Sequence, residues 1–106
     1  MITLEDFLKL ELKVAQIVEA KIHPNADRLL VLLVDNGTEK KEVVAGISRH
    51  YTPEELIGKK VVLVNNLQPA VLRGVTSNGM LLAAQDGESL ALVVPEKPVA
   101  TGATVR

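Results

Sequence analysis

The sequence predicts a single all-β domain, residues 1–106, built as a small barrel with one short helix. Three observations support this prediction. The chain has 106 residues, enough for one core, and 47% of them are hydrophobic, so a packed interior is expected. Short apolar segments alternate with turn signals along the chain. One segment in the middle, residues 51–60, carries helix-start and helix-stop residues instead.

The N-terminal half is expected to contain a helical turn and three strands. Residues 3–9 form the turn, because a threonine can cap it and an aspartate follows three residues later. Residues 12–22 alternate apolar and polar side chains, with extra apolar groups on the second face, which predicts a long, curved strand. Residues 23–27 are expected to be a loop. Two strands joined by an Asn-Gly hairpin signal follow it: residues 29–34 and 41–47.

The C-terminal half begins with the helix. Thr52, Pro53 and Glu55 combine an N-cap, a first-turn proline and a capping glutamate. Three strands are expected after it, at residues 60–67, 79–84 and 90–95, and the tail is expected to wrap the surface. Three strands, a helix and further strands are the order of the OB-fold, a five-stranded Greek-key barrel, here with N- and C-terminal extensions. A split β-sandwich is the competing all-β architecture, and the position of the helix favours the barrel.

Composition excludes several classes of protein. The chain has no cysteine, which rules out disulfides and thiolate metal sites. The first residues lack the pattern of a signal peptide, and the longest apolar run, residues 29–34, is far too short to span a membrane. A cytoplasmic protein is therefore expected. His23 and His50 are the only histidines and are expected to be ordinary loop or surface residues, with no metal and no cofactor.

No catalytic arrangement is recognisable. Ser48, Ser77 and Ser89 have no histidine beside them in a nucleophile pattern, and no glycine-rich phosphate loop occurs. The paired carboxylates belong to first helical turns, where the helix dipole explains them. The sequence therefore predicts a protein that is not an enzyme.

Charge is unevenly distributed. The formal net charge of −1 argues against a strong generic nucleic-acid binder. Residues 56–85, however, contain Lys59, Lys60 and Arg73 and no acid, which indicates a mildly positive face; chance spacing is the alternative. The chain has one phenylalanine and one tyrosine, too few for base-stacking platforms. Any nucleic acid would be bound through its backbone, its shape and a few polar contacts.

The segment RGVTSNGMLLAA, residues 73–84, holds more than a turn requires. An Asn-Gly turn needs neither Ser77 nor Met80. A hydroxyl and a flexible thioether at a barrel rim can reach a ribose 2′-OH or lie against a sugar or base. The alternative is that Ser77 shapes the turn and that Met80 fills the end of the core.

Three segments together resemble one family: HPNADRLLVL, VVAGISRHYTPEELIGKKVVLVNNLQP and GVTSNGMLLAA. This family is the tRNA-binding OB domain found at the C-terminus of bacterial methionyl-tRNA synthetases, as a stand-alone structure-specific tRNA-binding protein and in eukaryotic synthetase cofactors. The resemblance runs from about Asp6 to the C-terminus. It implies binding of tRNA by shape at the outer corner of the L, a homodimer, and an aminoacyl-tRNA synthetase as a further partner.

The resemblance also implies a tRNA site. Ser77 and Met80 match the serine and methionine of the family's S-x-x-M motif. Arg28 matches a position that more often holds lysine, and basic residues around these three are expected to contact phosphates. The full expected site is Asn25, Arg28, Lys59, Lys60, Arg73, Ser77 and Met80.

One departure from the family lowers the expected affinity. Between NNL and RG the family often carries two or more basic residues, where this chain has Gln68, Ala70 and Val71. Each missing phosphate contact weakens binding and flattens its salt dependence by roughly one unit of slope. Binding of tRNA is therefore expected to be weaker than in the family but still salt-sensitive.

Two other functions stay open. A related branch of the family is described as a peptide-binding export chaperone, and the near-neutral charge with apolar Ala70-Val71 suits a peptide groove. The second alternative is a dimerisation module without a ligand, because a small barrel this apolar hardly buries every hydrophobic group. Met1 and the capped turn after it favour a free-standing protein over a detached synthetase domain.

Overall fold

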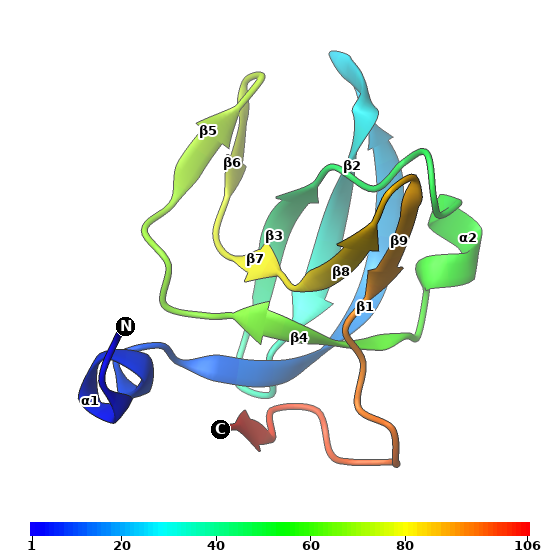
Figure 1. Cartoon of the computed structure of the whole chain (residues 1–106). Helices are drawn as coiled ribbons and strands as arrows, with labels where there is room; N and C mark the ends of the chain where they lie inside the picture. The colour runs from blue at the N-terminus through cyan, green and yellow to red at the C-terminus, as the bar shows by residue number, and fades with distance from the viewer.

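A computed structural model describes all 106 residues and shows an all-β architecture with two short helices (Figure 1). The elements, in chain order, are α1 (Leu4–Leu8), β1 (Leu12–His23), β2 (Ala26–Asp35), β3 (Lys40–Ala45), α2 (Pro53–Leu56), β4 (Lys60–Val64), β5 (Ala70–Leu72), β6 (Val75–Ser77), β7 (Met80–Leu81), β8 (Ala83–Asp86), β9 (Ser89–Leu92) and β10 (Thr104–Val105). The predicted all-β class is confirmed.

The largest sheet is organised around β1. Its strands follow the order β3-β2-β1-β4-β7, and β10 pairs with the start of β1. All of these pairs are antiparallel. The register between β1 and β2 shifts after Ile17 and again after Ile22, and such irregularities bend a strand. β1 is therefore bent, in agreement with the strongly curved strand expected at residues 12–22.

Alternation along β4 separates two apolar clusters. Val61 and Leu63 point into the main core of eleven buried residues, which draws on β1, β2, β3, α2 and β9 as well. Val62 and Val64 point the other way and form a smaller cluster with Leu12. Since side chains along a strand alternate between faces, β4 is covered on both sides.

Both helices begin as the sequence predicts. The Thr3 hydroxyl accepts a hydrogen bond from the Asp6 N–H, and the Asp6 carboxylate accepts one from the Thr3 N–H. The same reciprocal box joins Thr52 and Glu55 at the start of α2. Each box satisfies two backbone donors that an isolated helix end leaves free, so even helices this short have defined starts.

The expected strand boundaries need correction. β1 and β2 extend further than expected and leave only residues 24–25 as their turn, instead of a loop over 23–27. β4 ends at Val64, and the strand expected at 79–84 is interrupted between β7 and β8. The structure divides the strands into ten, arranged in three sheets, because bends and short hairpins interrupt the chain after β4.

The β5–β6 hairpin was not predicted. Leu72 pairs with Val75, and the two residues between them, Arg73 and Gly74, have φ angles of 54° and 90°. Two successive positive φ angles are the signature of a type I′ turn, which matches the twist of a hairpin. The turn escaped sequence analysis because arginine seldom occupies a left-handed position.

Two hydrogen bonds, and no regular ladder, connect β3 to the end of β6 and the residue after it. The Val44 N–H donates to the Ser77 hydroxyl oxygen at 2.9 Å, and the Asn78 N–H donates to the Glu42 carbonyl at 2.9 Å. Ser77 and Asn78 therefore attach the β5–β6 hairpin to the edge of the large sheet.

Candidate nucleic-acid interface

Two hairpin tips lie at the same end of the molecule, at the top of Figure 1. They are the β1–β2 turn, residues 24–25, and the β5–β6 turn, residues 73–74. His23 Nε2 lies 2.9 Å from the carbonyl oxygen of Leu72, which joins one tip to the other. We call this region the loop end and define it as residues 23–28, 47–50 and 72–75.

Residues 47–50, which leave β3, belong to the same end because Ser48 bonds to the start of β2. Its N–H donates to the Arg28 carbonyl at 3.4 Å, and its hydroxyl donates to the Asp27 carbonyl at 2.5 Å. Arg49 therefore stands beside the segment that carries Arg28. Arg49 is absent from the expected site, although a basic residue two positions after the third predicted strand is a signal for it.

The arginines of the loop end have no carboxylate partner. The one side-chain ion pair of the structure joins Lys9 and Asp6 on α1, at 3.3 Å. Arg28, Arg49 and Arg73 are all exposed, and they face a single acid within the loop end. Unpaired guanidinium groups on an exposed end are available for bidentate bonds to phosphate.

Ser77 lies inside the molecule, 5% exposed. Its hydroxyl accepts from Val44 and donates to the Gly79 carbonyl at 3.0 Å. Both directions of hydrogen bonding are used within the protein, and little of the side chain reaches solvent. This geometry agrees with the alternative that Ser77 shapes the turn.

Met80 lies on the outer surface of the sheet and not among the arginines. It pairs with Val64, whereas the neighbouring pair, Leu63 and Leu81, faces the main core. Met80 therefore shares the outer face with Val64, and its side chain is 46% exposed instead of filling the end of the core. Figure 1 shows β6 running away from the loop end before it reaches β7.

Lys59 and Lys60 also lie apart from the hairpin tips, at the junction of α2 and β4 (Figure 1). The Lys60 ammonium donates to the Val99 carbonyl of the C-terminal tail at 2.6 Å. The backbone and hydroxyl hydrogen bonds from Thr52, with a smaller contribution from the Lys59 charge, lower the pKa of Glu55. Lys60 thus contacts the tail, and the charge of Lys59 acts on Glu55.

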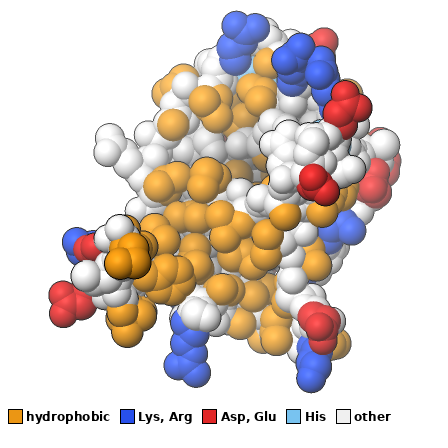
Figure 2. Space-filling model, viewed as in Figure 1, with side chains coloured by type: hydrophobic (Ala, Val, Ile, Leu, Met, Phe, Trp, Pro, Cys, Tyr) orange, Lys and Arg blue, Asp and Glu red, His pale blue; other side chains and the backbone are white.

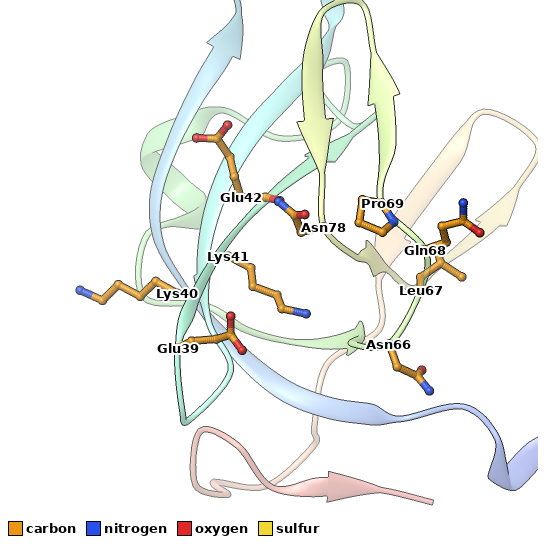
Figure 3. A pocket seen from close by; sticks show the side chains of 9 residues that line it. All are labelled: Glu39, Lys40, Lys41, Glu42, Asn66, Leu67, Gln68, Pro69 and Asn78. Carbon is orange, nitrogen blue, oxygen red and sulfur yellow. The ribbon is translucent and has the colours of Figure 1, made fainter.

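A polar groove of about 670 Å³ runs between β3 and the connection from β4 to β5. Figure 3 shows its lining, with Glu39, Lys40, Lys41 and Glu42 on β3 and its approach and Gln68 on the facing segment. The Lys41 ammonium crosses to the Asn65 carbonyl at 2.8 Å. Two lysines and two glutamates leave the groove without a dominant charge.

The backbone of β3 forms one wall of this groove. The Val44 N–H bonds to Ser77 at the end of β6 and the Glu42 carbonyl to Asn78 after it, so every second residue of β3 faces away from β2. By the same alternation, the Lys40 backbone and the Glu42 N–H point into the groove, where no ladder strand meets them. This stretch is an open sheet edge.

Hydrophobic side chains cover much of one face of the molecule. Figure 2 shows them gathered over α1, β4 and the strands after β6. We call this the apolar face: the exposed Leu4, Leu8, Leu10, Met80 and Val93, with Phe7 and Leu82, around the buried Leu12, Val62 and Val64. Leu4 and Leu8 are 71% and 62% exposed on a helix of five residues, which gains little from packing on its own chain.

The two histidines differ. His50 is exposed, as expected, whereas His23 is 3% exposed and not an ordinary loop residue. No three His, Cys, Asp or Glu side chains come together as metal ligands would. Neither helix has the length or the apolar character to cross a membrane.

The fold and the loop end define a small all-β domain with a free basic end. The chain belongs to the family described as "Putative tRNA binding domain", whose model matches residues 12–104. This confirms the family expected from the sequence segments. The chain is 60% identical over 105 residues, 99% of its length, to a methionine–tRNA ligase of Methanococcus aeolicus.

Solved structures agree with this assignment. A methionyl-tRNA synthetase related protein of Pyrococcus horikoshii matches 100% of this chain and 98% of its own, with a TM-score of 0.93 and 34% identity. The chaperone CsaA of Bacillus anthracis matches 100% and 99%, with a TM-score of 0.90 and 29% identity. The chain spans only 14% to 16% of the length of the first curated ligases it matches.

Proposed function

We propose that this chain is a non-catalytic tRNA-binding OB-fold domain, related to methionyl-tRNA synthetase, which recognises tRNA by its shape. The observation that carries the proposal is the set of unpaired arginines at the loop end of a chain that belongs to the tRNA-binding family. Backbone phosphates are the groups that such arginines bind, and few aromatic residues are present to read bases. The ligase relatives support a cytoplasmic place of action.

Arg28, Arg73 and Asn25 form the centre of the proposed tRNA site, and we add Arg49. Arg73 is the strongest member on physical grounds. Its φ of 54° costs a non-glycine residue about 1–2 kcal/mol, and asparagine or glycine would adopt it more cheaply. A charged side chain kept in a strained position at an exposed tip is typical of a binding residue.

Ser77 and Met80 act in this proposal through architecture. Ser77 attaches the strand after the hairpin to β3, and Met80 pairs with Val64 on β4. The S-x-x-M motif thus fixes the base of the hairpin that carries Arg73. Lys59 and Lys60 have a smaller part, since Lys60 is already bonded to the tail.

The affinity is proposed to be moderate. Gln68, Ala70 and Val71 occupy places where the family often has basic residues, and Val71 is 69% exposed. The hairpin therefore offers one charge, Arg73, where the family often carries two or more basic residues. Fewer phosphate contacts give weaker binding with a shallower salt dependence.

A homodimer through the apolar face is the second part of the proposal. Contiguous exposed hydrophobic side chains on a small domain mark an interaction surface, and a two-fold dimer is the commonest way to cover one. A dimer places two loop ends on one tRNA or on two. An aminoacyl-tRNA synthetase is the further partner that the ligase relatives suggest.

A polypeptide ligand is the alternative function, and the groove beside β3 favours it. An open sheet edge binds an extended chain by adding a strand, and the balanced charges of the groove suit mixed sequences better than phosphates. The likeness to the chaperone CsaA supports the same reading.

Competition separates the two functions. Fluorescently labelled bulk tRNA is titrated with the protein, and a reduced, unfolded polypeptide is then added as competitor. The proposal predicts saturable tRNA binding that falls with salt and resists the polypeptide. Binding of the polypeptide alone, with no tRNA complex at low salt, would transfer the function to the groove.

A further inference from the structure

We propose that His23 is a positioning residue, which clasps the two hairpin tips together so that Asn25 and Arg73 meet one tRNA backbone as a single surface. The inference rests on the proposed function for its ligand, but the clasp itself is a property of the fold. His23 is not among the residues expected to contact tRNA, and it is only 3% exposed.

The hydrogen bonds assign the tautomer of the ring. Nδ1 lies 2.9 Å from the Asn25 backbone N–H, which is only a donor, so Nδ1 accepts. Nε2 lies 2.9 Å from the Leu72 carbonyl oxygen, which is only an acceptor, so Nε2 carries the proton and donates. The ring is therefore neutral, with both nitrogens used, one for each tip.

Each bond ends beside a residue of the tRNA site. The bond from Asn25 holds the turn that follows β1, and the bond to Leu72 ends one residue before Arg73. The tip of the β5–β6 hairpin has little other support, because all three residues of β5 are exposed. A hairpin of this size is marginally stable by itself. The imidazole therefore sets where Arg73 stands relative to Asn25.

Two substitutions separate the bonds. The amide of His23→Asn lies where Nδ1 lies, so its oxygen can still accept from Asn25 while the bond to Leu72 is lost. The longer His23→Gln reaches the position of Nε2, so its NH₂ can still donate to Leu72 while the acceptor for Asn25 is lost. Leu72 is 38% exposed, so water can satisfy its carbonyl when the clasp is absent.

The first test measures tRNA affinity and its salt dependence for both variants of the full chain. His23→Asn is expected to bind labelled bulk tRNA about fivefold more weakly, with a salt slope lower by about one unit, as when the Arg73 contact is lost. His23→Gln is expected to stay within about twofold of the native chain. Arg73→Ala is expected to add little to His23→Asn.

A role confined to stability predicts a different pattern. Equal losses of affinity in both variants at an unchanged salt slope, or full additivity of His23→Asn with Arg73→Ala, would overturn the clasp. Thermal unfolding of each variant establishes that the proteins compared are folded.

The second test needs neither tRNA nor a variant. Nitrogen-15 NMR of the native imidazole is expected to show a protonated Nε2 and an unprotonated, hydrogen-bonded Nδ1, and Arg73 is expected to be as ordered as the sheet. A proton on Nδ1 or a mobile Arg73 would contradict the clasp. If the clasp is seen but tRNA does not bind, the proposed function fails and the clasp stands.

Discussion

At the loop end three arginines stand free around two tight turns, whereas the apolar face exposes leucines, a valine and Met80 over α1, β7 and the chain after β9. The loop end is held by hydrogen bonds from the side chains of His23 and Ser48 to backbone carbonyls. The apolar face is held by a small buried cluster around Val62 and Val64. The difference fits the two proposed partners, a polyanion for the loop end and a hydrophobic surface for the apolar face.

Charging the apolar face is expected to have the largest effect. Leu4→Glu with Leu8→Glu places two carboxylates on one side of α1 and is expected to abolish the proposed dimer, because burying unpaired charges is prohibitive. Light scattering at micromolar concentration checks the mass. Thr38→Glu, on the exposed β2–β3 connection, adds a carboxylate away from the apolar face and is expected to leave the mass unchanged. A native chain that is already a monomer would contradict a dimer through the apolar face.

Removing the Ser77 hydroxyl is expected to have an intermediate effect, a loss of stability where the β5–β6 hairpin joins β3. Ser77→Ala leaves the Val44 N–H, on a residue 7% exposed, without its partner, which costs about 1–3 kcal/mol of unfolding free energy. Urea unfolding measures this loss. Thr76→Ala, exposed on the same strand, is expected to change stability by less than about 0.5 kcal/mol. Equal values for the two variants would show that Ser77 does not attach the hairpin.

The smallest effect is expected at α2, away from both regions. The hydrogen bonds from Thr52 lower the pKa of Glu55 below its ordinary value, so its carboxylate stabilises the native state above the pKa of the unfolded chain. That contribution is lost as the pH falls through the lowered pKa. The melting temperatures of the native chain and Glu55→Gln are expected to differ slightly at pH 7 and to converge in acid. A constant gap would mean that the charge of Glu55 plays no part.

The sequence was sufficient for the elements that local chemistry determines. The capping residues Thr3 and Thr52 correctly predict the starts of the two helices, and the Asn36-Gly37 signal correctly predicts the turn between β2 and β3. The family was recognisable because several ordered segments, and not one motif, carried it. These features depend on neighbours in the chain, which a sequence displays directly.

Other features depend on distant partners and stayed hidden. The turn at Arg73 uses a conformation that arginine rarely adopts, so nothing marked the β5–β6 hairpin. The burial of His23 and Ser77 follows from contacts 49 and 33 residues away along the chain. The expected site mixed Arg28 and Arg73, which share the loop end, with Met80, which the pairing register turns to the apolar face.

The measurement that tests the central claim most directly is the salt dependence of tRNA binding by the native chain and by Arg28→Ala with Arg73→Ala. We expect weaker binding for the variant and a slope lower by about one unit for each arginine removed. Lys97→Ala with Arg106→Ala removes the same charge from the exposed C-terminal tail and is expected to keep the native slope. Identical slopes for the native chain and the Arg28 and Arg73 variant would contradict a tRNA site at the loop end.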